Sequence, residues 1–481
     1  MKTDCAWEKY SDKQLKEVEK LSQGYRVFLD EGKTERECVN YIVNEIEEKG
    51  YVELAKVLKE GRKLKAGDRV YAVNMEKAVI LFHIGSQGLE EGMNILGAHL
   101  DSPRLDVKQN PLYEDSGFAY LDTHYYGGIK KYQWVTIPLA IHGVVVKKDG
   151  TVIDISIGEE DDDPVFFVSD LLIHLAAEQM EKKANKVIEG EALDIIIGNR
   201  PLKYGAKAEK ADDKASENDK DKPEDKQTKD KVCAFALDIL RQQYDMEEED
   251  FLSAELEIVP AGKAREAGLD RSMILAYGQD DRVCSYSSLV AMLEQKKPKR
   301  TNCCILVDKE EIGSVGATGM QSRFFENCVA EIMNLTGEYS DLALRRCLAN
   351  SRMLSSDVSS AYDPAFAGSF DKKNVAYLSH GMVFNKFTGS RGKSGSNDAN
   401  AEYIAFIRKI MDDANVSFQT AELGKVDLGG GGTIAYILSL YGMNVIDCGV
   451  PVMNMHAPHE ATSKADLYEA KCGYAAFLKA E

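Results

Sequence analysis

Short apolar runs that alternate with helix-patterned segments restrict the fold of this chain more than any other feature. After residue 250 the runs SAELEIVPA and SMILAYG are followed by a stretch near 282–294, and the run NCCILVD is followed by another near 322–335. In those stretches apolar residues recur at three- and four-residue spacing, as on one face of a helix. Strands that alternate with helices indicate an α/β fold, in which helices cover a sheet. We therefore expect an α/β protein.

The two ends of the chain and its middle have different patterns. The first 65 residues are predicted to be helical, since apolar residues recur at helical spacing with charge on the opposite face. Between about 107 and 250, GVVVKKDGTVIDISIG predicts a hairpin that turns at Asp149-Gly150, and FVSDLLIHLAAEQMEKKA predicts a helix. With 481 residues the chain is long enough for two domains. The simplest architecture is an α/β domain of residues 1–106 and 252–481, interrupted by a β-rich insertion at 107–251.

A stretch of mixed charge lies inside this insertion. Residues 207–231 include eight basic and nine acidic residues among 25. A segment without an apolar face cannot offset the conformational entropy lost on ordering. We predict a charged, flexible surface loop there.

Composition excludes several classes of partner. The formal net charge of −19 argues against nucleic acid and anionic membranes. The sequence has no run of 18 apolar residues, and its first residues lack the apolar core of a secretory signal. The ten cysteines are irregularly spaced, which favours buried reduced thiols. We expect a cytoplasmic protein without a membrane span.

Histidines and carboxylates gather at the ends of predicted strands, where α/β folds build their ligand sites. Five segments carry His99, Asp101, Asp280, Asp281, Glu310, Glu311, Asp357 and His456. Taken alone, each is better explained by a core histidine or by acids at a helix N-terminus. Together they form the ligand mixture that zinc accepts, and a shared carboxylate allows two metals roughly 3.5–4 Å apart.

These segments resemble those of the aspartyl aminopeptidase family of clan MH, which also includes the vacuolar aminopeptidase I type. The blocks GAHLDSPRLD, YGQDDRVC, DKEEIGSVGATG, GSRGKSGSNDANAE, LGGGGTIA and PVMNMHAPHE are closest to the bacterial branch, and the resemblance spans nearly the whole chain. It implies a metallo-aminopeptidase that removes single N-terminal residues from peptides. It also implies a mixed β-sheet between helices, with the insertion serving as a β-rich dimerisation domain.

The resemblance assigns a role to each candidate residue. It implies two zinc ions per chain, with cobalt and manganese as alternatives. The ligands would be His99, Asp280 and Asp357 for one ion, and Asp280, Glu311 and His456 for the other. Asp280 would bridge the ions, and the Asp280–Asp281 peptide would be cis.

Two further acids would assist these ligands. Asp101 would accept a hydrogen bond from the second ring nitrogen of His99 and so orient the ring. Glu310 would be the general base that takes the proton of the attacking water and then protonates the leaving amine.

Substrate preference is left open by the sequence. Lys386, with Arg391 and Lys393, lies in the Gly- and Ser-rich stretch NKFTGSRGKSGSNDANAE. The resemblance favours Lys386 as a pocket cation for Asp or Glu, whereas the alternative is a solvated basic loop. A broad or neutral aminopeptidase is the alternative activity, and a catalytically silent assembly or cargo-binding scaffold is the alternative of another class.

The resemblance also implies an assembly. Similar proteins form tetrahedral dodecamers built from dimers, so a homo-oligomer is expected. Eukaryotic members place a histidine donated by a neighbouring subunit four residues before the position of His174, and here that position is Asp170. The donated role is therefore not carried over. We expect His174 in a helix facing the core, and His459 at the surface.

Overall fold

The computed structural model describes residues 4–202 and 230–481. The chain forms two compact units, one of residues up to 103 together with 263–481, the other of residues 104–262. The second unit reaches beyond 251 because strand β10 (Ala254–Pro260) pairs with β7 (Leu139–Val146) and β5 (Arg104–Asp115).

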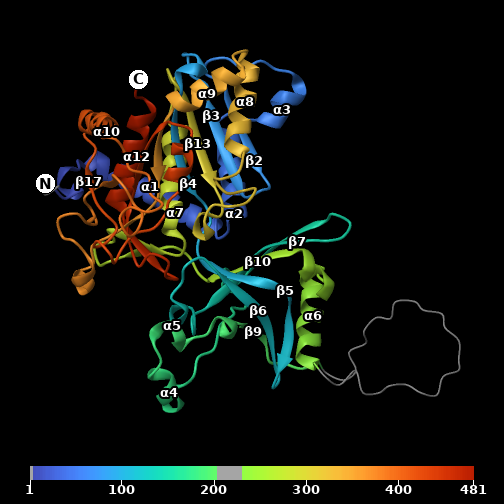
Figure 1. Ribbon diagram of the computed structural model, residues 1–481. Helices are drawn as coiled ribbons and strands as arrows, with labels where there is room; N and C mark the ends of the chain where they lie inside the picture. The colour runs from blue at the N-terminus through green and yellow to red at the C-terminus, as the bar shows by residue number, and fades with distance from the viewer. Residues whose placement is uncertain (1–3, 203–229) are drawn as a thin grey trace, which may run out of the picture. The chain divides into compact units, whose positions relative to one another are not determined.

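A nine-stranded sheet forms the centre of the first unit (Figure 1). It contains both parallel and antiparallel pairs, so the predicted mixed sheet is confirmed. Its strands, in spatial order, are β1 (Val52–Glu53), β2 (Arg69–Asn74), β3 (Ala78–His83), β13 (Thr301–Val307), β4 (Met93–His99), β14 (Arg352–Ser356), β18 (Asn444–Gly449), β16 (Met382–Asn385) and β17 (Phe418–Thr420).

Helices cover both faces of this sheet, because alternate residues of a strand point to opposite faces. On β3, Leu81 belongs to one apolar core and Ile80 to another. The first core is closed by α1 (Asp12–Glu31), α2 (Glu35–Glu48), α7 (Gln279–Leu293), α10 (Ala401–Asp413) and α12 (Lys464–Leu478). The second is closed by α3 (Leu54–Glu60), α8 (Phe324–Thr336), α9 (Asp341–Asn350) and α11 (Ala435–Ser439).

The helical start of the chain is confirmed by α1, α2 and α3, with only the short β1 between the last two. Both long helices begin with a capping box, at Ser11 and at Thr34. Such caps satisfy N–H groups that a helix start leaves without partners. The core-facing residues of α1 include Val18, Leu21 and Tyr25, at helical spacing.

The first unit also contains a smaller, five-stranded sheet. It consists of β11 (Arg265–Ala267), β12 (Met273–Ala276), β20 (Glu460–Ser463), β19 (Pro451–Met453) and β15 (Ser359–Ser360). Helix α7 follows β12, and the Asp280–Asp281 peptide at its start is cis, as the resemblance implied.

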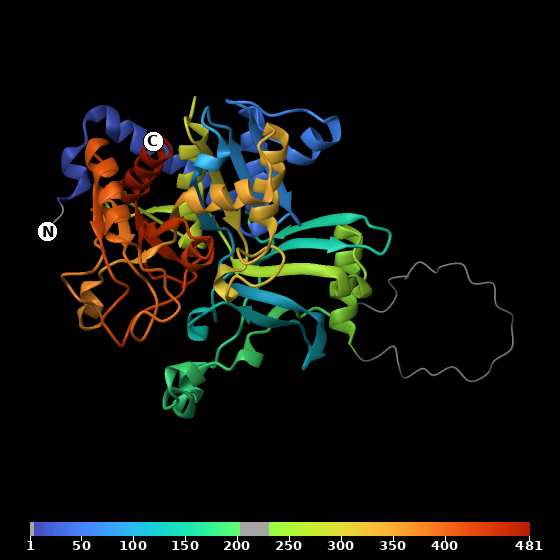
Figure 2. The ribbon, with the colours of Figure 1, turned by 45° about the horizontal axis from the view of Figure 1, so that its top comes forward.

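The second unit is built on a six-stranded antiparallel sheet, with the order β8 (Val152–Ile157), β7, β10, β5, β6 (Phe118–Tyr126) and β9 (Ile195–Gly198). Helix α6 (Lys231–Tyr244) runs along β5 and β6, as the turned view shows (Figure 2). The hairpin at Asp149-Gly150 is confirmed, with Gly150 at φ +89° in the turn between β7 and β8.

The helix predicted over FVSDLLIHLAAEQMEKKA is wrong. The segment forms a 3-10 turn at Ile173–Leu175 and two single helical turns, α4 (Ala177–Met180) and α5 (Ala184–Val187). A helix in a protein is stabilised mainly by packing its apolar face, and here the side chains of Ile173 and Leu175 are more than two-thirds exposed. His174 is exposed as well, so the predicted core histidine is also wrong.

Other predictions concern the remaining parts of the chain. The charged stretch 207–231 lies outside the described residues except for Asp230 and Lys231, and Lys231 begins α6. All ten cysteines are free and most are buried, which confirms the reduced thiols. Residues 4–202 and 230–481 include no helix long and apolar enough to cross a membrane.

Candidate metal centre

Three neighbouring parallel strands end at the same edge of the large sheet and deliver four of the six residues predicted as metal ligands and general base. Strand β4 pairs in parallel with β13 on one side and β14 on the other. His99 is the last residue of β4, Asp357 directly follows β14, and Glu310 and Glu311 come just after β13. The carboxyl ends of such strands form the ligand-binding edge of α/β sheets.

The small sheet supplies the remaining two residues. Asp280 lies at the start of α7, four residues after β12 ends. His456 lies in the loop between β19 and β20, with a left-handed backbone at φ +64°. Both sheets thus direct polar side chains to one place in the first unit.

Asp280 lies between the two histidines. Its Oδ1 is 3.4 Å from Nε2 of His99, and its Oδ2 is 3.2 Å from Nε2 of His456. The Asp280 side chain is nearly buried. One carboxylate therefore offers a different oxygen to each imidazole.

Other carboxylates complete a group around each histidine. Asp357 Oδ1 is 3.9 Å from His99 Nε2, and Glu311 Oε1 is 3.4 Å from His456 Nε2. Glu310 Oε2 is 3.8 Å from His99 Nε2. The ligand atoms lie within 4.8 Å of one another in three groups: His99–Asp280–Asp357, Asp280–Glu311–His456, and His99–Glu310–Glu311.

The donor atoms fit a zinc site by both spacing and chemistry. Zinc bound tetrahedrally at about 2.0–2.1 Å separates its ligand atoms by about 3.3 Å, close to the spacing from Asp280 to each imidazole. His99 Nε2, Asp280 Oδ1 and Glu311 Oε1 are buried and make no hydrogen bond among the described residues. Buried polar atoms are normally satisfied, so these three atoms are suited to a cation.

The electrostatics of the cluster favour positive charge. Burial, together with the neighbouring carboxylates, raises the pKa of Asp357 and Glu311 well above the ordinary values. The same effects raise the pKa of Glu310 to about 7. Burial alone would also raise the pKa of Asp280, but the neighbouring imidazoles of His456 and His99 hold it below the ordinary value. A bound cation would stabilise all four carboxylates in their charged form.

Asp101 supports the cluster from behind His99. Nδ1 of His99 lies 3.0 Å from the backbone oxygen of Asp101 and 3.3 Å from its Oδ1. This contact places the ring proton on Nδ1 and leaves Nε2 to face the cluster. The carboxylate also accepts the backbone N–H groups of Glu310 at 3.1 Å and Glu311 at 3.2 Å.

Two buried acids escaped the sequence analysis as candidates for a role here. Asp281 was named only as a neighbour of Asp280, yet its carboxylate accepts the backbone N–H of His99. Glu460 was not considered, although it closes the block PVMNMHAPHE. Burial and the Asp280 carboxylate raise the pKa of Glu460 to about 8, and hydrogen bonds from backbone N–H groups oppose this rise. Its place four residues after His456, at the end of that block, was the available signal.

Lys386 has a carboxylate partner outside the histidine cluster. It follows β16, its side chain is about half exposed at 49%, and its ammonium group pairs with Asp398. Lys393 binds the other oxygen of Asp398 at 3.1 Å. Two of the three basic residues of this stretch thus share one acid. His459 is exposed, as predicted.

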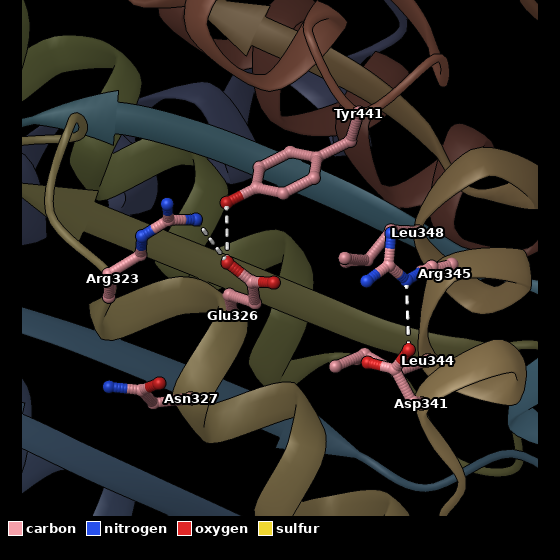
Figure 3. Close-up of a pocket in the computed structure, with 8 residues that line it drawn as sticks. All are labelled: Arg323, Glu326, Asn327, Asp341, Leu344, Arg345, Leu348 and Tyr441. Carbon is pink, nitrogen blue, oxygen red and sulfur yellow. Dashed lines mark hydrogen bonds and ion pairs between the residues drawn. The ribbon is translucent and has the colours of Figure 1, made fainter.

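A cavity of about 620 Å³ lies between α8, α9 and the loop after α11 (Figure 3). Its charged side chains neutralise one another, because Arg323 pairs with Glu326 and Arg345 with Asp341. Tyr441 also donates to Glu326 (Figure 3). No histidine lines this pocket, so it lacks the imidazole ligands of a zinc site. The histidine cluster is therefore the better candidate for the functional site.

Comparison with known proteins gives consistent matches. The family model described as aminopeptidase I zinc metalloprotease (M18) matches residues 28–478. A probable M18 family aminopeptidase 1 of Clostridium acetobutylicum is 61% identical over 473 residues, which cover 98% of this chain and 97% of that protein.

Solved structures agree with this match. The crystal structure of the M18-family aminopeptidase from Thermotoga maritima has a TM-score of 0.90 at 41% identity and covers 100% of this chain and 99% of its own. The S. cerevisiae mApe1 dodecamer has a TM-score of 0.73 at 19% identity, covering 95% and 96% of the two chains. That second likeness shows the fold alone.

Proposed function

Because this chain belongs to the M18 family of aminopeptidase I zinc metalloproteases, and is thus an aminopeptidase and a hydrolase, we propose that it works with two metal ions per chain. The observation that carries the proposal is the position of Asp280, which offers Oδ1 to one histidine and Oδ2 to the other. A single carboxylate shared in this way is the usual bridge of a two-metal site.

The proposed ligands form two sets. His99, Asp280 and Asp357 hold one ion, and Asp280, Glu311 and His456 hold the other. Zinc in such a site supplies Lewis acidity, which lowers the pKa of a coordinated water to about 7 and polarises the scissile carbonyl. Imidazole and carboxylate also suit cobalt and manganese.

Glu310 is the proposed general base. Its side chain is 14% exposed, compared with 4% for Glu311, so it is the more open of the two adjacent glutamates. With its pKa raised to about 7, it can accept a proton from water at neutral pH and return one to the leaving amine. Asp101 accepts the backbone N–H of Glu310 and so fixes the position of the backbone that carries this side chain.

Metal content tests the two-metal proposal. Apoprotein reconstituted with zinc, freed of excess metal and measured by elemental analysis should contain two ions per chain. Asp280→Asn should lower the content of both ions, since both depend on this carboxylate. A content that never exceeds one per chain, with Asp280→Asn unchanged, would contradict the bridged site.

We propose a preference for acidic N-terminal residues, with Lys386 as the cation that receives their side chains. The basic residues of 386–393 are a local exception in a chain of net charge −19. The ion pair of Lys386 with Asp398 favours the alternative, a broad or neutral aminopeptidase, because a carboxylate already neutralises this lysine.

Kinetics with aspartyl, glutamyl, leucyl and lysyl substrates decide between these two preferences. A charged hydrogen bond would favour acidic substrates by about 1.5–3 kcal/mol, or roughly one to two decades in kcat/KM. Lys386→Met should remove that advantage, while Lys393→Met, which loses the other partner of Asp398, should leave it. Faster cleavage of leucyl or lysyl substrates by the unaltered enzyme would establish the broad activity instead.

We further propose that the chain forms a homo-oligomer through its inserted unit, and that the assembly is a dodecamer built from dimers. In this unit the segment 165–180 exposes large apolar side chains, at Val165, Phe167, Leu171, Leu172, Ile173, Leu175 and Met180. Apolar surface of this kind marks interfaces. Asp170 within it accepts hydrogen bonds from Leu171 N–H and the Gln179 side chain, which is a local role in the turn.

A further inference from the structure

Glu460 links two of the proposed ligands, Asp280 and His456, through their backbone N–H groups. Its carboxylate is buried, with the residue only 1% exposed. Oε2 accepts the backbone N–H of Asp280 at 3.0 Å, and Oε1 accepts the backbone N–H of His456 at 2.7 Å. One carboxylate therefore fixes the main chain of the proposed bridging ligand relative to that of a proposed histidine ligand.

Glu460 is itself held firmly. It begins β20 and lies opposite Ala276 of β12 in the small sheet. The side-chain amide of Gln279 donates to the backbone oxygens of both Glu460, at 2.5 Å, and Ile274, at 3.1 Å. The carboxylate is thus carried by a paired strand, and its two oxygens point at the backbone N–H groups of Asp280 and His456.

The backbone of His456 requires such support. Its φ of +64° is in the left-handed region, which residues other than glycine seldom adopt and which costs roughly 1–2 kcal/mol. The loop around it is nonetheless ordered so that Nε2 lies 3.2 Å from Asp280 Oδ2. The hydrogen bond from His456 N–H to Glu460 stabilises this conformation directly.

We propose that Glu460 is a positioning residue, which sets the separation of Asp280 and His456 before a metal ion binds. The inference rests on the two-metal function proposed above. Asp101 does the same on the other side, since its two oxygens accept the N–H groups of Glu310 and Glu311. Each of these two acids lies outside the proposed ligand sets and holds the main chain of two residues proposed to act at the site.

The test measures cobalt binding by the apoprotein. Visible absorption monitors the binding, and competition with a chelator gives the affinity. Glu460→Gln keeps the size of the side chain, but its amide group cannot accept the second N–H. Loss of such supporting contacts lowers metal affinity by about 10- to 100-fold. We expect a loss in this range for the ion held by Asp280, Glu311 and His456, and a changed cobalt spectrum.

Asp466→Asn is the matched control. Asp466 is also fully buried and also accepts two backbone N–H groups, from Ser379 at 2.6 Å and Gly381 at 2.7 Å, but it holds none of the candidate ligands. It should lower thermal stability while leaving both cobalt affinities unchanged. Glu460→Asp keeps the charge but is one methylene shorter, so it should show a smaller loss than Glu460→Gln.

The outcomes separate this inference from the proposed function. If the unaltered protein binds two cobalt ions and Glu460→Gln binds both equally well, only the role of Glu460 fails. If the unaltered protein binds fewer than two, the two-metal function fails, and Glu460 is judged on the affinity of the remaining ion. If Glu460→Gln does not fold, Glu460→Asp is judged in its place. Failure of both to fold, or a loss equal to that of Asp466→Asn, overturns the positioning role.

Discussion

Adjacent residues in this chain have different surroundings, and Glu310 and Glu311 show this most clearly. Both backbone N–H groups donate to Asp101, yet the Glu311 carboxylate lies 3.4 Å from His456 while that of Glu310 is the more open. Their substitutions should therefore have separate effects.

Glu310→Gln should retain metal and lose turnover, because an amide cannot accept the proton of water. General-base catalysis contributes about 10²–10⁴-fold, which sets the expected loss in kcat. Glu311→Ala should instead lower the metal content. Elemental analysis and kcat, measured on the same preparations, check both. The opposite pair of results would exchange the roles and favour the group His99–Glu310–Glu311 as a ligand set.

His83 predicts a dependence of stability on pH away from the metal centre. It is 1% exposed at the end of β3, and burial lowers its pKa to about 4, with a further contribution from Arg69. A folded pKa below the unfolded value of about 6.5 means that the unfolded chain gains the proton first as pH falls. The stability due to neutral His83 is therefore present above pH 6.5 and is lost as pH falls toward 4.

Between pH 7 and pH 5 this loss amounts to about 2 kcal/mol. Denaturant unfolding of metal-free protein at both pH values measures it, and His83→Gln should show a smaller decrease by that amount. Equal decreases in the two proteins would show that His83 does not carry the effect.

At the scale of elements, local signals determine where a helix begins. Helix α2 starts at a reciprocal cap, in which Thr34 Oγ1 accepts the N–H of Glu37 at 3.2 Å and the Glu37 carboxylate accepts the N–H of Thr34 at 3.0 Å. The motif is visible in the sequence as Thr-Glu-Arg-Glu before an apolar-patterned stretch.

Thr34→Ala should lower the free energy of unfolding by about 1 kcal/mol, since the N–H of Glu37 loses its acceptor. Thr34→Ser keeps the hydroxyl and should restore most of the loss. Denaturant unfolding of the three metal-free proteins checks this. If serine and alanine destabilise equally, the threonine methyl group and its packing account for the effect.

At the scale of the whole molecule, the exposed apolar segment 165–180 lies within the unit we propose as the assembly domain. Ile173 is 69% exposed and Leu175 is 68% exposed. In a homo-oligomer these side chains would be covered by a second copy of the chain.

Ile173→Asp with Leu175→Asp should therefore shift the protein to smaller species, because charge at an apolar interface opposes association. Size-exclusion chromatography with light scattering measures the mass. Leu269→Asp is the control, since Leu269 is fully exposed in the other unit and should leave the mass unchanged. An unchanged mass for the double substitution would place the interface elsewhere.

The sequence predicted the α/β class, the strand that ends at His99, the strand just before Asp357, the hairpin at Asp149-Gly150 and the first helices. Each depends on neighbours within a few residues, and the periodicity of apolar side chains reports such local order directly. The same pattern predicted a helix around His174, and there it misled. Periodicity shows which residues can be buried together, and it does not show whether a partner surface exists.

Contacts between distant segments were decided only by the tertiary structure. Glu460 meets Asp280 across 180 residues, and Asp101 meets Glu310 across 209. The pairing of β10 with β5 and β7 moved the boundary of the second unit beyond residue 251. A buried carboxylate can accept any N–H group that the fold brings within reach. The sequence therefore determined which side chains could bind a metal, and the packing of two sheets decided which buried carboxylates hold the backbones of those residues in place.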